Sequence, residues 1–93
     1  MSKENFNILV VDDEKDYCDV LKMILTGKGY KVETCENGAE AVKKLEKKAF
    51  DLVISDLCMP VMDGRELLEE IKKREYDAEV ILLTAYGLSL IHI

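Results

Sequence analysis

The expected fold rests on residues 50–56, which read FDLVISD. The apolar residues 52–54 follow one another with no polar residue between them. Such a run is typical of a β-strand covered on both faces, as in a parallel sheet. We predict a strand at residues 50–55 (FDLVIS). A carboxylate, Asp56, follows it directly, and four residues later stands the only proline of the chain, Pro60. An acid at the end of a buried strand therefore needs an explanation.

Strand and helix patterns alternate along the rest of the chain. Further strands are predicted at residues 6–11 (FNILVV), 30–35 (YKVETC) and 79–84 (EVILLT). Helices are predicted at residues 14–28, after Asn37, and from Asp63 to about Glu75, because apolar residues recur there at helical spacing. The order βαβαβαβ predicts an α/β fold with a doubly wound parallel sheet, right-handed crossovers and helices on both faces.

Two of these helices carry pairs of residues typical of a helix start. Asn37 is followed three residues later by Glu40, and Asp63 is followed three residues later by Glu66. A side chain that accepts from the first turn, combined with a glutamate three residues on, is the pattern of a capping box. We expect both helices to begin at these pairs.

Composition limits the classes of function. The chain has 93 residues, which suits one small domain, with 48% hydrophobic and 34% charged residues. The net charge of −6 argues against binding nucleic acid, which favours a positive surface. No apolar run is long enough to span a bilayer, and the N-terminal MSKENFN lacks the core of a signal peptide. We therefore expect a cytoplasmic protein.

The cysteines do not suggest a disulfide or a zinc site. There are three of them, Cys18, Cys35 and Cys58, and no two form a CxxC pair. We expect small, half-buried thiols.

Acids and a hydroxyl stand where the predicted strands end. Asp12 and Asp13 follow the first strand, Asp56 follows the third and Thr84 ends the fourth. Sites in open parallel sheets form at the carboxyl ends of the strands. Taken singly, each acid could be a helix cap or a solvated side chain. If the first and third strands are neighbours, three carboxylates converge, and a hard cation such as Mg²⁺ or Mn²⁺ would relieve their repulsion.

Three motifs resemble the response-regulator receiver domain of bacterial two-component signalling. They are ILVVDDE at 8–14, DLVISDLCMPVMDG at 51–64 and VILLTAYG at 80–87. The resemblance covers residues 6–87 and implies a flavodoxin-like sheet. It also implies a signalling module in a phosphorelay, not an enzyme.

The resemblance assigns a role to individual residues. Asp56 aligns with the phosphoacceptor, and Asp12 and Asp13 align with the acidic pair that holds Mg²⁺. The backbone carbonyl of Cys58 would be a further Mg²⁺ ligand, and Thr84 aligns with the switch hydroxyl that meets the phosphoryl group. Ala85 aligns with the small residue beside it, and Pro60 and Gly64 shape the loop after the acceptor. The implied partners are a sensor histidine kinase or phosphotransfer protein and an output domain outside this chain, with no membrane contact.

Two alternatives stay open beside this hypothesis. One is a receiver that docks to its partners without accepting phosphate. The other is a phosphatase with an aspartate nucleophile, which would need the nucleophile on the first strand and a second aspartate two residues later. Asp12 and Asp13 are adjacent instead.

The pattern departs from the family after Gly87, where the chain reads LSLIHI. The family would continue with a helix, a fifth strand that carries a phosphate-binding lysine, and a last helix. We therefore expect a truncated receiver domain at 1–87 and a non-matching apolar tail at 88–93. The incomplete sheet is expected to leave an open edge and one poorly covered face. A parallel return needs a crossover of a dozen or more residues, so we expect the tail to return as an antiparallel strand.

Overall fold

The computed structural model describes residues 5–56, 62–84 and 87–91, with the backbone alone at 84 and 87–91. In this part of the chain, strands and helices alternate until two strands follow each other at the end. Their bounds are β1 (Asn7–Val11), α1 (Lys15–Gly27), β2 (Lys31–Cys35), α2 (Gly38–Lys47), β3 (Leu52–Asp56), α3 (Gly64–Lys73), β4 (Glu79–Thr84) and β5 (Gly87–Ile91). The predicted strands and helices are all present, with ends within two residues of the expected positions.

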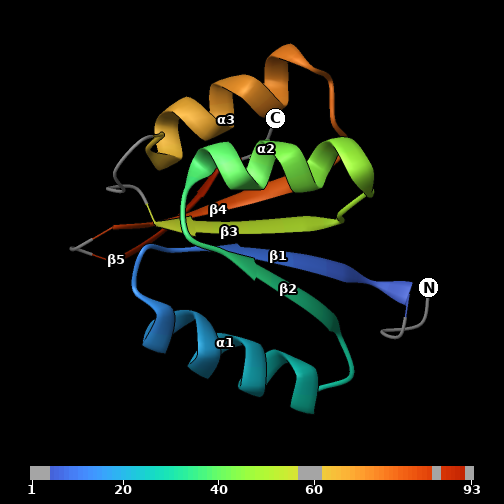
Figure 1. The fold of residues 1–93 in the computed structure, drawn as a ribbon, viewed down its shortest axis with the longest axis vertical. Coiled ribbons are helices and arrows are strands. Elements are labelled where there is room, and N and C mark those ends of the chain that lie inside the picture. Colours follow the sequence, from blue (N-terminus) through green and yellow to red (C-terminus); the bar gives the residue numbers. More distant parts are fainter. Residues whose placement is uncertain (1–4, 57–61, 85–86, 92–93) are drawn as a thin grey trace.

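The strands form one sheet in the order β2-β1-β3-β4-β5 (Figure 1). The four strands β1 to β4 run parallel to their neighbours. Helices α2 and α3 cover one face of the sheet and α1 covers part of the other (Figure 1). This arrangement confirms the doubly wound α/β fold. Because β1 pairs directly with β3, the carboxyl ends of these two strands lie side by side.

The larger core lies between the sheet and α2 and α3. Leu9 of β1 and Val53 of β3 are fully buried there, against Leu67 and Ile71 of α3. On the other face, Ile8 and Val10 of β1 pack with Cys18 of α1 in a smaller cluster. Alternate residues of the central strands therefore point into two separate cores, which explains their continuous apolar sequence.

The last strand differs from the others in direction. β5 runs antiparallel to β4, with Gly87 opposite Thr84 and Ile91 opposite Val80. The antiparallel return expected from the short connection is confirmed. Within the part of the chain that the structure describes, we find no helix with the length and apolar character needed to cross a membrane.

Candidate metal centre at the sheet edge

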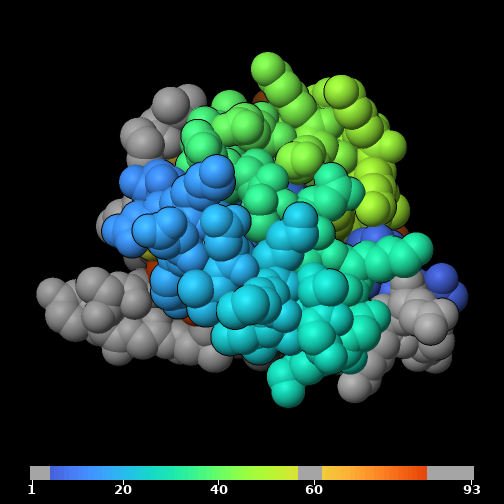
Figure 2. Space-filling view, turned by 60° about the horizontal axis from the view of Figure 1, so that its bottom comes forward, coloured from blue at the N-terminus to red at the C-terminus, as the bar shows by residue number. Residues whose placement is uncertain are grey.

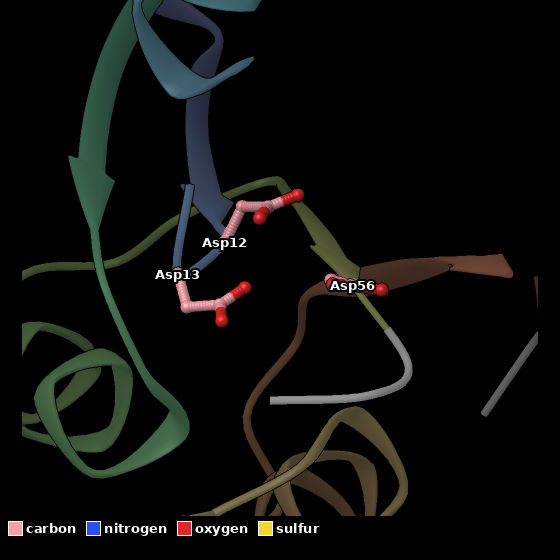
Figure 3. Close-up of side chains that lie close together, drawn as sticks. All are labelled: Asp12, Asp13 and Asp56. Carbon is pink, nitrogen blue, oxygen red and sulfur yellow. The ribbon is translucent and has the colours of Figure 1, made fainter. Parts of the chain in front are cut away.

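Three carboxylates converge at the carboxyl edge of the sheet. Asp12 and Asp13 follow the last residue of β1, and Asp56 is the last residue of β3. One oxygen atom from each of the three side chains lies within 4.8 Å of the others. Figure 3 shows Asp12 and Asp13 at the end of one strand and Asp56 at the end of its neighbour. The predicted convergence therefore follows from the adjacency of β1 and β3.

The backbone around Asp12 fixes its side chain in place. The N–H of Asp12 donates to the carbonyl of Cys35 at 3.1 Å, which extends the pairing of β1 with β2 by one residue. One oxygen of its carboxylate accepts from the N–H of Glu14 at 2.9 Å. Asp12 is only 7% exposed, whereas Asp13 is exposed and Asp56 is half-buried. The centre thus opens to solvent on the Asp13 side.

The surroundings of Asp12 disfavour its negative charge. Burial raises the pKa of the Asp12 carboxyl above its usual value, and the nearby Asp56 and Asp13 raise it further. The hydrogen bond from the Glu14 N–H offsets part of this effect. A cation bound between the three carboxylates would remove the repulsion. The residues present therefore fit a divalent metal ion.

The ligand atoms favour a hard metal over zinc. All three are carboxylate oxygens, which suit Mg²⁺ or Mn²⁺. Cys18 and Cys35 are free and buried, and burial raises the pKa of their thiols to about 11 and about 12, respectively. Thiols with such pKa values stay protonated at neutral pH, which makes them poor metal ligands.

Ser55 supports the end of strand β3 and was not singled out from the sequence. It is fully buried, and its hydroxyl donates to the backbone carbonyl of Asp56 at 3.0 Å. The hydrogen bond holds the backbone of Asp56 at the point where β3 ends. The sequence did contain a signal for Ser55, because it is a polar residue in an otherwise apolar strand and stands directly before an acid.

Gly38 was also missed, because its role depends on tertiary contact. Its N–H donates to the carbonyl of Met62 at 3.2 Å, which ties the start of α2 to the segment before α3. A Cβ atom at Gly38 would lie 2.7 Å from the Met62 side chain and 2.8 Å from the Met62 carbonyl oxygen. Only glycine allows this close approach.

The structure describes only some of the other residues that the sequence analysis assigned to the site. Asp56 pairs with Leu83 across β3 and β4, so the backbone of Thr84 lies one residue further toward the same edge. Gly64 is buried at the first position of α3. The positions of Cys58, Pro60 and Ala85 lie outside the described residues.

Sequence comparison places the chain among known regulators. The response regulator receiver domain family matches residues 8–90. The transcriptional regulatory protein ZraR of Klebsiella oxytoca is 45% identical over 87 residues, which cover 94% of this chain and 20% of the relative. The regulatory protein VanRc of Enterococcus gallinarum is 39% identical over 80 residues, or 86% of this chain and 34% of the relative. The chain thus spans a fifth to a third of these curated relatives.

Solved structures of response regulators also match this chain. The response regulator TrrA of Thermotoga maritima, in complex with Mg²⁺-BeF, is 49% identical with a TM-score of 0.81. That match covers 87% of this chain and 70% of TrrA. TrrA in complex with the histidine kinase ThkA also matches, with a TM-score of 0.81 over 88% of this chain and 71% of that one.

Proposed function

The chain belongs to the response regulator receiver domain family, and from this premise we propose that Asp56 accepts a phosphoryl group from a histidine kinase. In this proposal, Asp12, Asp13 and Asp56 hold Mg²⁺. The observation that carries the proposal is the meeting of three carboxylates at the ends of β1 and β3. The three like charges repel one another, and a bound cation would offset that repulsion.

The proposed step is an in-line displacement at phosphorus. A carboxylate oxygen of Asp56 attacks the phosphorus of a phosphohistidine, the new O–P bond forms, and the P–N bond to the imidazole breaks. When bound, Mg²⁺ supplies positive charge to the transferring group. The chain itself contributes position, because β3 is paired on both sides and carries Asp56 at its end.

We assign supporting roles to two further positions. The backbone carbonyl of Cys58 is proposed as a metal ligand, and the hydroxyl of Thr84 is proposed to donate to a phosphoryl oxygen. The register of β3 and β4 supports the second assignment, because Thr84 follows the partner of Asp56.

The module is proposed to act in the cytoplasm as the receiving half of a two-component pathway. The relative ZraR is a transcriptional regulatory protein, of which this chain spans 20%. We therefore propose that phosphorylation shifts a conformational equilibrium that is read by an output domain outside this chain.

One observation favours a second candidate, a receiver that docks without being phosphorylated. The residues after Thr84 read AYGLSLIHI, which contains no lysine, and β5 runs antiparallel to β4. The strand beside β4 in the described structure therefore supplies no lysine to the site. With this strand in place, a phosphoryl group on Asp56 would rely more on Mg²⁺ to balance its charge.

Intact-mass spectrometry after incubation with Mg²⁺ and acetyl phosphate separates these candidates. The proposal predicts an adduct of one phosphoryl group that is lost in Asp56→Asn. Asp51→Asn is the matched control, because Asp51 lies just before the other end of the same strand and should leave the adduct intact. No adduct on a folded chain would favour docking alone. Steady hydrolysis of a phosphomonoester that depends on Asp12 but not on Asp56 would instead indicate a phosphatase.

A further inference from the structure

The end of helix α2 gathers lysines beside the edge strand β2. Four of the six residues 43–48 are lysines: Lys43, Lys44, Lys47 and Lys48. Together with Glu33 of β2, these side chains line a hollow of about 280 Å³. Figure 2 shows α2, in green to yellow-green, and β2, in teal, on one face of the molecule. We call this feature the lysine hollow.

Glu33 offsets only one of the four positive charges. One of its carboxylate oxygens accepts from Nζ of Lys44 at 3.1 Å, and the other accepts from Nζ of Lys48 at 2.8 Å. Lys43 and Lys47 are exposed, and neither has an ion-pair partner among the described residues. The lysine hollow therefore has an excess of three positive charges, on a chain whose net charge is −6.

This excess of charge is more than the end of a helix requires. Lys43 and Lys47 stand four residues apart, and like charges at this spacing destabilise a helix. Cations do interact favourably with the helix dipole, but this effect falls off within the last turn. Lys44 and Lys47 lie in the last turn of α2, whereas Lys43 precedes it. The helix dipole therefore does not account for Lys43.

The end of helix α3 provides a comparison within the same molecule. It also has two lysines in its last turn, Lys72 and Lys73. Lys72 lines a different hollow, in which the other charged side chains are all acids: Glu75, Asp77 and Glu79. Basic and acidic side chains are thus mixed at the end of α3, whereas lysines dominate the hollow at the end of α2.

The lining of the lysine hollow favours an anion with several charged oxygens. Ammonium groups only donate hydrogen bonds, and they bind phosphate oxygens as point charges. A single phosphate has few charges to share among four lysines, whereas a chain of two or three phosphates can reach several ammonium groups at once. Among the described residues, no aromatic side chain lines the hollow. It therefore offers contacts to phosphates and no surface on which a nucleobase could stack.

We propose that the lysine hollow binds a polyphosphate anion, such as a diphosphate or triphosphate group. Glu33 holds Lys44 and Lys48 in place, and Lys43 and Lys47 have no ion pair to break before they turn toward the ligand. Helix α2 begins near the carboxyl edge of the sheet and runs back toward the amino edge (Figure 1). The lysine hollow is thus away from the three carboxylates, and its ligand does not depend on the proposed phosphoacceptor.

Titration of the chain with sodium tripolyphosphate, followed by NMR of the backbone amides, tests this proposal. Low ionic strength limits screening, and the absence of Mg²⁺ keeps the metal centre out of the measurement. We expect a dissociation constant below about 1 mM, with the largest shifts in residues 43–48. Orthophosphate should bind at least about tenfold more weakly, because it reaches fewer ammonium groups. Equal binding of the two anions would contradict the assignment to polyphosphate.

A pair of double variants separates the lysine hollow from an effect of net charge. Lys43→Gln with Lys47→Gln removes the two unpaired ammonium groups and should raise the dissociation constant at least about fivefold. Lys72→Gln with Lys73→Gln is the matched control. It makes the same change in net charge at the end of α3 and should alter the constant less than about twofold. Equal effects of the two double variants would overturn the proposal.

Titration with ATP distinguishes a free polyphosphate from a nucleotide. If only the phosphate chain is bound, the dissociation constants of ATP and tripolyphosphate should agree within about tenfold. A larger preference for ATP would show that the nucleoside is bound as well, and would overturn the assignment. No saturable shift at about 10 mM tripolyphosphate would also overturn it. So would binding of a DNA duplex by a chain that does not bind tripolyphosphate.

Discussion

Asp51 lies just before strand β3 and Asp56 is its last residue, and the two side chains have different surroundings. Asp51, just before β3, accepts from the N–H of Asn7 at 2.8 Å through its side chain. Its own N–H donates to the carbonyl of Asn7 at 2.8 Å, and its carbonyl accepts from the N–H of Glu79 at 3.1 Å. Asp56, at the other end, lies beside Asp12 and Asp13.

The difference separates a carboxylate that stabilises the fold from the three carboxylates for which we propose a chemical role. At the amino edge, Asp51 joins the starts of β1, β3 and β4 and satisfies a backbone N–H that would otherwise lack a partner. At the carboxyl edge, like charges are brought together, which costs stability unless a cation binds. The same residue type thus has a structural role at one edge and a proposed functional role at the other.

Asp51→Ala should produce the largest loss of stability among the changes considered. It removes a charged acceptor from the Asn7 N–H, and we expect the free energy of unfolding to fall by about 1.5–3 kcal/mol. Urea denaturation measures this change. Asp51→Asn is the control, because it retains an oxygen acceptor and should cost less. A loss below about 0.5 kcal/mol for Asp51→Ala would contradict the structural role of the amino edge.

Gly38→Ala tests the packing that shapes the carboxyl edge. The new Cβ would meet Met62 at 2.7 Å, and we expect a loss of about 1–3 kcal/mol in the free energy of unfolding. Gly27→Ala is the matched control, because nothing lies within 4 Å of its Cβ position. Its helical position should make it neutral or stabilising by up to about 1 kcal/mol. Equal effects of the two substitutions would refute the close contact.

Magnesium should stabilise the carboxyl edge and leave the amino edge unaffected. At about ten times its dissociation constant, a ligand that binds only the folded state adds about 1.4 kcal/mol to the free energy of unfolding. We expect Mg²⁺ to raise the Tm of the chain and of Asp51→Asn. Asp12→Asn should abolish the Mg²⁺-dependent rise. A rise that persists in Asp12→Asn would place the ion elsewhere.

The ion pairs of Glu33 should have the smallest effect and a defined pH dependence. Lys48, at 2.8 Å, and Lys44, at 3.1 Å, lower the pKa of the Glu33 carboxyl below its usual value. The stabilisation is therefore present above the unfolded pKa and lost as pH falls through the lower, folded pKa. Because the Glu33 side chain is 37% exposed, Glu33→Gln should cost about 0.2–1 kcal/mol at neutral pH.

Urea denaturation of the chain and of Glu33→Gln at two pH values measures this contribution. The difference between the two proteins should disappear at acid pH, where Glu33 is protonated. A difference that persists there would show that packing, and not charge, accounts for the contribution of Glu33.

The convergence of the acids was predictable because it depends on topology. Carboxyl ends of neighbouring parallel strands share one edge, so Asp12 and Asp56 had to meet once β1 and β3 were neighbours. The unequal burial of Asp12 and Asp13 was not predictable. It depends on how the turn after β1 directs two adjacent side chains.

The starts of the helices were predictable to the extent that they depend on local contacts. Asp63 and Glu66 form the expected reciprocal capping box. Asn37 accepts from the N–H of Glu40, but its side-chain amide donates to the Glu40 carboxylate. Asparagine carries a donor beside its acceptor, so this side chain competes with its own backbone N–H for the glutamate.

Helical periodicity did not predict which apolar residues of α1 are buried and which are exposed. Its apolar residues recur at helical spacing, yet Leu21 and Leu25 pack on the sheet while Val20 and Ile24 remain exposed. A sequence pattern indicates that a helix has an apolar side. It does not indicate how much of that side the neighbouring strands and helices cover.

Locating the modified residue provides the sharpest test of the phosphoacceptor site. The chain would be incubated with Mg²⁺ and acetyl phosphate and then treated with borohydride, which reduces an acyl phosphate on aspartate to the alcohol of homoserine. Peptide mass spectrometry should find homoserine at position 56 alone, and only in samples that contained Mg²⁺. Homoserine at position 12 or 13, or a modification that does not require Mg²⁺, would contradict the assignment of Asp56 as the acceptor beside a metal site.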